Sequence, residues 1–153
     1  MNNDAFQDHY PDDLAHCYGC GHLNEHGHHI KSYWDGDETV CRFDPEPYHT
    51  AIPGYVYGGL IASLIDCHGT GTAAAAAYRH QNRSMAGEPA LRFVTAALQV
   101  DYLRPTPLGP ELDLRGTQGE FQVAWFNPRE GGPLVTTTTS QVAAAANVKL
   151  GAP

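Results

Sequence analysis

One carboxylate, Asp66, lies in the otherwise apolar segment GYVYGGLIASLID (residues 54–66). A carboxylate in such surroundings can deprotonate a water molecule or attack a carbonyl carbon itself. Gly58 and Gly59 precede it, where the apolar pattern of a helix begins. The first turn of a helix has backbone N–H groups without intrahelical acceptors, and these can stabilise negative charge on a carbonyl oxygen. The two features together are suited to chemistry on a carbonyl group, whereas the alternative is that Asp66 is a solvated or capping residue.

The spacing of these groups indicates a site shared between two chains. Eight residues of helix span about 12 Å, so Asp66 and the Gly58 N–H can hardly act on one carbonyl from a single chain. We therefore expect Asp66 to act as general base or nucleophile opposite Gly58 of a second copy. The residues do not distinguish between the two roles of Asp66.

Other side chains of the same segment have more ordinary explanations. Ser63 and Thr70 share the face of Asp66 and could orient its carboxylate or a water, but helical hydroxyls often bond to their own backbone instead. His68 and Cys67 point away from that face, and we interpret His68 as a packed histidine. The sequence has no G-x-S-x-G motif, which argues against a serine hydrolase of the α/β type.

The cysteines at positions 17, 20, 41 and 67 are expected to be free thiols, because nothing indicates export. Cys17 and Cys20 form a C-x-x-C pair in a histidine-rich segment, and thiolates and imidazoles are the ligands of zinc. A second pair of ligands at recognisable spacing is missing, so a tight glycine-rich turn is the favoured interpretation over structural zinc. No catalytic metal is expected. The neighbouring histidines are His16, His22, His26, His28 and His29.

The composition bounds the class of protein. The chain has 153 residues, enough for one domain, and 9 Lys and Arg residues against 17 Asp and Glu residues. This balance disfavours binding to nucleic acid or to anionic membranes. The N-terminal residues do not resemble a signal peptide, and no apolar segment has the length of a membrane span. We therefore expect a soluble, cytoplasmic protein.

The elements that position these residues follow from periodicity. Residues 57–80 have a helical pattern that is apolar on most sides, which favours a helix surrounded by other elements. Alternation around Asp35-Gly36-Asp37 predicts an antiparallel hairpin before it, and three or four strands rich in β-branched and aromatic residues follow it. The expected fold class is α+β, an antiparallel sheet of five or six strands wrapped around one long central helix. We expect an irregular N-terminal arm over residues 1–27 and a single domain over residues 28–153.

Three segments in this order resemble the PaaI-like group of hotdog-fold acyl-CoA thioesterases. CYGCGHLNEHG is similar to a Cys-aromatic-x-Cys-Gly pattern followed by Asn and Gly, and VDYLRPTPLG is similar to a strand ending in Leu-Arg-Pro. GYVYGGLIASLID is similar to Gly-x-Val-His-Gly-Gly, then seven mostly apolar residues and an acid. The resemblance runs from Cys17 to the last expected strand. Tyr57 stands where the family usually has histidine, so no imidazole role is carried over.

The resemblance implies hydrolysis of an acyl-CoA or acyl-carrier thioester without a cofactor, by a homodimer or a dimer of dimers. It implies catalytic roles for Asp66 and for the Gly58 N–H of the partner. We expect the acyl pocket to include Tyr48, Tyr57 and Leu60, and the phosphates of coenzyme A to need arginines, with Arg79 and Arg83 as weaker candidates. The expected substrate-binding residues are Tyr57, Gly59, Ser63, Thr70, Arg92 and Arg104.

Two alternatives stay open at this point. One is a hotdog hydratase or dehydratase on acyl thioesters, which would use a histidine such as His49 beside the acid. The other is a protein without catalytic activity that binds acyl-CoA, or that binds zinc through Cys17 and Cys20.

Overall fold

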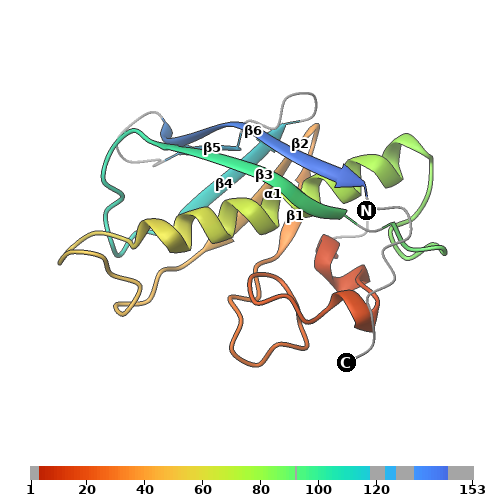
Figure 1. The fold of residues 1–153 in the computed structure, drawn as a ribbon, viewed down its shortest axis with the longest axis horizontal. Helices are drawn as coiled ribbons and strands as arrows, with labels where there is room; N and C mark the ends of the chain where they lie inside the picture. The colour runs from red at the N-terminus through yellow and green to blue at the C-terminus, as the bar shows by residue number, and fades with distance from the viewer. Residues whose placement is uncertain (1–3, 92, 118–122, 127–132, 145–153) are drawn as a thin grey trace.

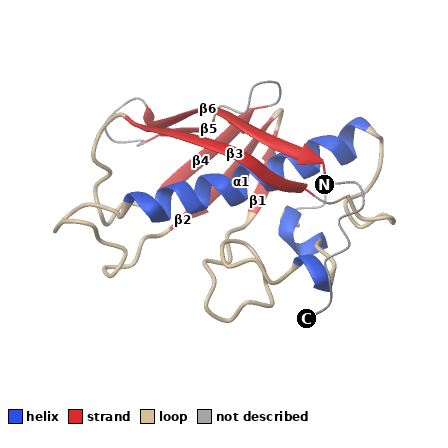
Figure 2. Cartoon of the chain, in the orientation of Figure 1, coloured by secondary structure: helices blue, strands red, loops and turns tan. Residues whose placement is uncertain are grey.

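The computed structural model describes residues 4–91, 93–117, 123–126 and 133–144. One long helix, α1 (Gly58–His80), lies across one face of an antiparallel sheet (Figures 1 and 2). The sheet has six strands in the order β1-β2-β4-β5-β6-β3. The predicted α+β class is confirmed, as is each predicted strand region. The strands are β1 (Ser32–Asp35), β2 (Glu38–Phe43), β3 (Phe93–Tyr102), β4 (Leu112–Thr117), β5 (Val123–Phe126) and β6 (Pro133–Ala144).

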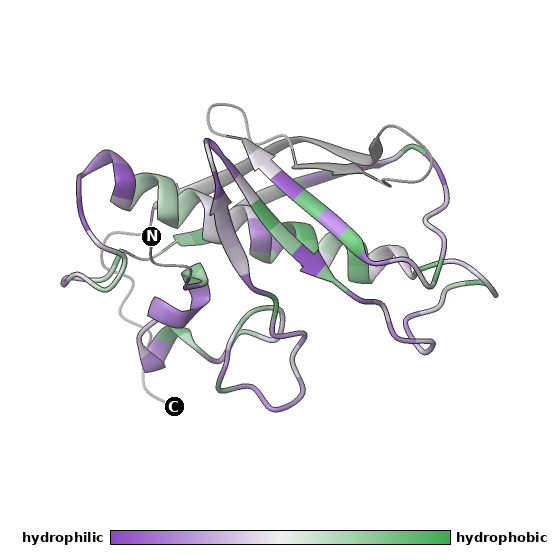
Figure 3. Ribbon diagram, turned by 180° about the vertical axis from the view of Figure 1, so that it is seen from behind, coloured by the Kyte–Doolittle hydropathy of each residue, from purple (hydrophilic) through white to green (hydrophobic). Residues whose placement is uncertain are grey.

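The predicted hairpin joins β1 and β2. Asp35 pairs with Glu38, so the loop has two residues, and Gly36 adopts a φ of 65° that favours glycine. Side chains alternate along β2, where Thr39 and Cys41 are buried and Arg42 is exposed. Figure 3 shows the matching alternation of hydrophobic and hydrophilic residues on the strands near the helix. The hairpin thereby covers α1 with its inward face.

Helix α1 is buried on several sides, as its apolar pattern predicts. Leu64 and Ile65 belong to the core cluster, and His68 and Thr72 contact the hydroxyl of Thr39 on β2. The second half of the helix is rich in small residues. At Gly71 they admit the N-terminal arm, because a Cβ there would lie 3.1 Å from Gln7 Nε2.

The N-terminal arm contains two short 3₁₀ helices, η1 (Phe6–His9) and η2 (Asp12–Leu14), and it packs on α1 and β1. Gln7 is fully buried, accepts a hydrogen bond from the Ser32 N–H at 2.8 Å and donates one to Ser32 Oγ at 3.1 Å. Phe6 packs edge-on against Trp34. The side chains of the arm thus complete the core around the helix.

Strand β3 forms one edge of the sheet. It pairs with β6 on one side, and among the described strands nothing pairs with its other side. Val94 and Tyr102, near its two ends, are more than half exposed. An unpaired edge ten residues long is a template for a strand of another chain.

Among the described residues, α1 included, no helix has the length and apolarity needed to cross a lipid bilayer.

Candidate active site

Asp66 lies in the middle of α1 and points toward the edge strand β3. Thr95 on β3 donates a hydrogen bond to Asp66 Oδ1 at 2.5 Å. Thr70 donates to the backbone carbonyl oxygen of Asp66 at 2.9 Å, and its Oγ1 lies 2.9 Å from Thr95 Oγ1. The hydroxyl of Thr70 therefore reaches the carboxylate only through Thr95. Asp66 is half-buried and held in place by a neighbouring strand, unlike a freely solvated surface acid.

A cavity of about 350 Å³ opens in front of the Asp66 carboxylate. Thr70 and Thr95 line it beside the acid, and Cys17, Cys20 and Cys67 line it as well. The rest of its wall is largely apolar and comes from the arm, from the second half of α1, from the loop after α1 and from the start of β3. These wall residues include Tyr10, Leu14, Ala74, Tyr78, Met85 and Phe93. The site therefore combines an apolar cavity with a small number of convergent polar groups, as ligand sites do.

The start of α1 lies outside that cavity, between two tyrosine rings. A Cβ at Gly59 would lie 2.4 Å from Tyr57 Cε1, and a Cβ at Gly58 would lie 3.3 Å from Tyr102 Cε1. Tyr102 also donates a hydrogen bond from its hydroxyl to the Gly58 carbonyl oxygen at 2.7 Å. The two glycines thus provide room for the tyrosine rings. Within one chain, Gly58 is not among the described residues that line the cavity of Asp66.

The other predicted substrate-binding residues are scattered. Ser63 is half-buried, and its Oγ would lie 3.7 Å from a Cβ at Gly19. Arg104 is exposed just beyond the end of β3, whereas Arg92 lies outside the described residues. Tyr48 and Tyr57 are exposed at the surface, and Leu60 is part of the core. Of the predicted residues that the structure describes, only Thr70 shares the cavity with Asp66.

The weaker arginine candidates have other contacts. Arg79 stacks over the ring of Trp34, with 3.6 Å between the guanidinium carbon and the ring centroid. Arg83 donates hydrogen bonds to the carbonyl oxygens of Gly87 and Pro89. Both side chains therefore stabilise the region around the end of α1.

His68 is a packed histidine, as predicted. Its ring is fully buried, with Nδ1 2.9 Å from Ser32 Oγ and Nε2 3.4 Å from Thr39 Oγ1. Burial lowers the pKa of His68 from 6.5 to about 4. His68 faces the sheet, away from the cavity of Asp66.

His49, the candidate base of the hydratase alternative, lies in a surface cluster of rings. It contacts Tyr48, Phe43 and His28, and its Nδ1 accepts a hydrogen bond from the Glu46 N–H at 2.9 Å. It does not line the cavity that Asp66 lines.

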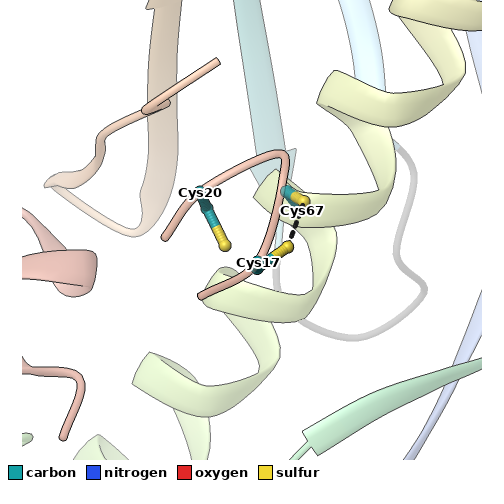
Figure 4. Close-up of side chains that lie close together, drawn as sticks. All are labelled: Cys17, Cys20 and Cys67. Atoms are coloured by element: carbon teal, nitrogen blue, oxygen red, sulfur yellow. Dashed lines mark hydrogen bonds between the residues drawn. The ribbon is translucent and has the colours of Figure 1, made fainter. Parts of the chain in front are cut away.

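The four cysteines are free thiols, and three of them converge (Figure 4). Cys17 Sγ lies 3.7 Å from Cys67 Sγ. Hydrogen bonds from the Cys20 and Cys67 thiols lower the pKa of Cys17, and the same contacts raise the pKa values of Cys20 and Cys67. Sequence reasoning missed this cluster and the contact of Thr95 with Asp66, because both join residues that are distant in sequence. The C-x-x-C pair was the only sequence signal for the cluster, and no signal pointed to Thr95.

Comparisons with known proteins show the family and the fold of the chain. A family model described as the thioesterase superfamily matches residues 53–118. A thioesterase superfamily protein of known structure from Shewanella loihica PV-4 is 50% identical, with a TM-score of 0.54, over 76% of this chain and 83% of that one. The PaaI protein of Escherichia coli, from the phenylacetic acid degradation operon, shares the fold with a TM-score of 0.53 at 18% identity, over 75% of this chain and 80% of that one.

A curated relative is acyl-coenzyme A thioesterase THEM4 from Xenopus laevis, which is 41% identical over 70 residues. The match covers 46% of this chain and 26% of THEM4, so the chain spans about a quarter of that protein. Together the comparisons confirm the predicted hotdog fold.

Proposed function

This chain belongs to the thioesterase superfamily, and on that premise we propose that it hydrolyses an acyl-CoA thioester to a free acid and a thiol. The observation that carries the proposal is the position of Asp66, a carboxylate oriented by Thr95 at the wall of an apolar cavity. The name of THEM4, an acyl-coenzyme A thioesterase, supports the choice of thiol.

The proposed chemistry assigns one oxygen of Asp66 to orientation and the other to reaction. Thr95 binds Oδ1, so Oδ2 is the oxygen that reacts. As a general base, Oδ2 takes a proton from water while the hydroxide adds to the thioester carbonyl. As a nucleophile, Oδ2 adds to the carbonyl carbon, the C–S bond breaks, and water then hydrolyses the mixed anhydride. In both routes the thiolate leaves and is protonated.

The proposed oxyanion donor is the Gly58 N–H of a partner subunit. Gly58 is the first residue of α1, where N–H groups have no intrahelical acceptor and the helix dipole favours negative charge. Tyr57 before it is extended, and its side chain makes no capping hydrogen bond to the first turn. A carbonyl oxygen placed against this N–H would be stabilised as it becomes negative.

The edge strand β3 suggests how two subunits would form this site. Asp66 contacts Thr95 near the start of β3, and Gly58 contacts Tyr102 at its end. In an antiparallel pair of two β3 strands related by a twofold axis, Thr95 can face Tyr102 of the partner subunit. Asp66 of one subunit would then lie beside Gly58 of the other, so that the two groups could act on one carbonyl although they are far apart along a single helix.

The cavity is the proposed acyl pocket. Its largely apolar wall suits an acyl chain or ring, whose burial is favourable by about 25 cal/mol per Å². The exposed Arg104 follows β3 and is a proposed contact for the phosphates of coenzyme A.

The test is hydrolysis of a panel of short, aromatic and long acyl-CoA compounds, followed by a thiol-trapping reagent. We expect Asp66→Asn to reduce kcat at least about a hundredfold. Asp37→Asn is the control, because Asp37 is an exposed carboxylate in the β1–β2 turn, outside the cavity and at the other side of the sheet from β3. Near-normal turnover of Asp66→Asn on a good substrate would remove the assignment. Single turnover in ¹⁸O-labelled water can identify the nucleophile route, because label enters the Asp66 side chain only when water attacks the Asp66 carbonyl carbon of the mixed anhydride. Label in the released acid alone is compatible with both routes.

A further inference from the structure

The three converging cysteines form a group that the proposed hydrolysis does not use. Cys17 and Cys20 belong to the N-terminal arm, and Cys67 belongs to α1 (Figure 4). All three Sγ atoms lie within 4.8 Å of one another. Among the described residues, this is the one group of three or more cysteine, histidine or acidic side chains arranged closely enough to hold a metal ion.

The sulfur separations match those of a zinc site more closely than those of a disulfide. A tetrahedral zinc ion with Zn–S bonds of about 2.3 Å has sulfur atoms about 3.8 Å apart. The Cys17 and Cys67 sulfurs are 3.7 Å apart, and the remaining separations are at most 4.8 Å. A disulfide bond would instead need two sulfurs about 2.0 Å apart. Small rotations of the cysteine side chains would therefore bring the three sulfurs to the separations of a zinc site.

The backbone of the arm is shaped to bring the thiols together. Gly19, between the two cysteines of the arm, passes directly over Cys67, because a Cβ at this position would lie 2.2 Å from Cys67 Sγ. The Cys17 carbonyl oxygen accepts a hydrogen bond from the Gly21 N–H at 2.8 Å, and the Gly19 carbonyl oxygen accepts one from the Ile30 N–H at 3.1 Å. The turn is thus fixed by its own hydrogen bonds and by contact with the helix.

The surroundings leave room for a fourth ligand. The three cysteines line the same cavity as Asp66, so a water molecule or an anion can reach an ion bound between the sulfurs. Cys20 and Cys67 are buried, whereas Cys17 is exposed and gives an ion a path from solvent. Soft thiolate ligands in this arrangement select zinc over magnesium or calcium.

We propose that Cys17, Cys20 and Cys67 bind one Zn²⁺ ion that joins the N-terminal arm to α1. The pair Cys17 and Cys20 alone favours a simple turn, and Cys67 supplies the third ligand from a distant part of the sequence. Binding of the ion stabilises the arm that forms one wall of the cavity. The cysteines share a cavity with Asp66, but the proposal of an ion does not rest on the proposed hydrolysis.

The experiment uses the full chain without a histidine tag, reduced, freed of metal by a chelator and then incubated with Zn²⁺. After gel filtration, elemental analysis should find about one zinc per chain, and thermal unfolding should shift to a higher temperature. Cobalt in place of zinc should give thiolate-to-metal charge-transfer bands and the visible spectrum of a tetrahedral site. Cys17→Ser and Cys67→Ser should abolish zinc retention and the charge-transfer bands.

Cys41→Ser is the matched control, because Cys41 is a buried thiol on β2 outside the cluster, and it should retain the metal. Asp66→Asn should also retain it, which separates failure of this proposal from failure of the proposed hydrolysis. If Cys67→Ser does not fold, the exposed Cys17→Ser decides the matter. Absence of zinc from the reduced wild-type chain would overturn the proposal. Retention of zinc by Cys17→Ser and Cys67→Ser would overturn it as well, and would point to the histidines.

Discussion

Acidification should destabilise the fold through His68. The ring is fully buried between Ser32 and Thr39, and its burial lowers the pKa from 6.5 to about 4. The unfolded chain therefore binds a proton at a higher pH than the folded chain does. The contribution of neutral His68 to stability is complete above pH 6.5 and is lost as the pH falls from 6.5 to about 4. The expected loss from this residue is about 2 kcal/mol between about pH 7 and pH 5, and about 3 kcal/mol by about pH 4.

The assay is urea unfolding followed by circular dichroism, with wild type and His68→Gln compared at about pH 7 and pH 5. Glutamine keeps a neutral polar group near the two hydroxyls and does not titrate. A fixed protein concentration keeps any subunit association equal, and a chelator removes any contribution of bound metal. His68→Gln is expected to be less stable at neutral pH and to lose about 2 kcal/mol less than wild type on acidification.

The reasoning is refuted if the two proteins lose the same free energy of unfolding between these pH values. An NMR titration of the His68 ring provides a direct check. The expected midpoint is about 4, and a midpoint near 6.5 would show that burial does not disfavour the charged ring.

Three further substitutions follow from the described contacts. Thr95→Val removes the hydrogen-bond donor to Asp66 Oδ1 and should lower kcat about tenfold to a hundredfold, whereas Thr95→Ser should retain activity. Equal kcat values for the two variants in the thiol-release assay would count against a role of Thr95 in orienting Asp66. Gly58→Pro removes the proposed oxyanion donor at the first helical position, which accepts proline after an extended residue. We expect kcat to fall at least about a hundredfold for Gly58→Pro, and less for Gly58→Ala, which keeps the N–H group. A fully active Gly58→Pro would exclude this donor. Leu64→Ala empties a fully buried position and should cost about 2 to 5 kcal/mol in urea unfolding, and a cost below about 1 kcal/mol would mean that Leu64 is not a core residue.

Local patterns were sufficient to predict the elements of the fold. The turn at Gly36 and the alternation beside it predict the β1–β2 hairpin, because a two-residue loop with a positive φ fixes the register of its strands. The helix from Gly58 to His80 follows from its length and its apolar faces. These features depend on neighbours in the sequence, so they can be read without the tertiary structure.

Contacts between distant segments could not be predicted in this way. The contact of Thr95 with Asp66 and that of Cys17 with Cys67 depend on how the sheet and the arm pack on α1. Asp66 could be singled out because an acid in an apolar helix is unusual, whereas a threonine in a strand carries no such signal. The rings of Tyr57 and Tyr102 at the helix start were missed because two glycines indicate open space but not what fills it.

The central claim is that Asp66 of one subunit and the Gly58 N–H of its partner act on the same thioester. The most direct measurement mixes two inactive variants, Asp66→Asn and Gly58→Pro, after reversible unfolding, and then assays thiol release. In a mixed dimer one site carries both substitutions and the other carries neither, so an equal mixture should recover about a quarter of wild-type activity. A mixture that contains the mixed dimer and stays as inactive as its components would contradict the account.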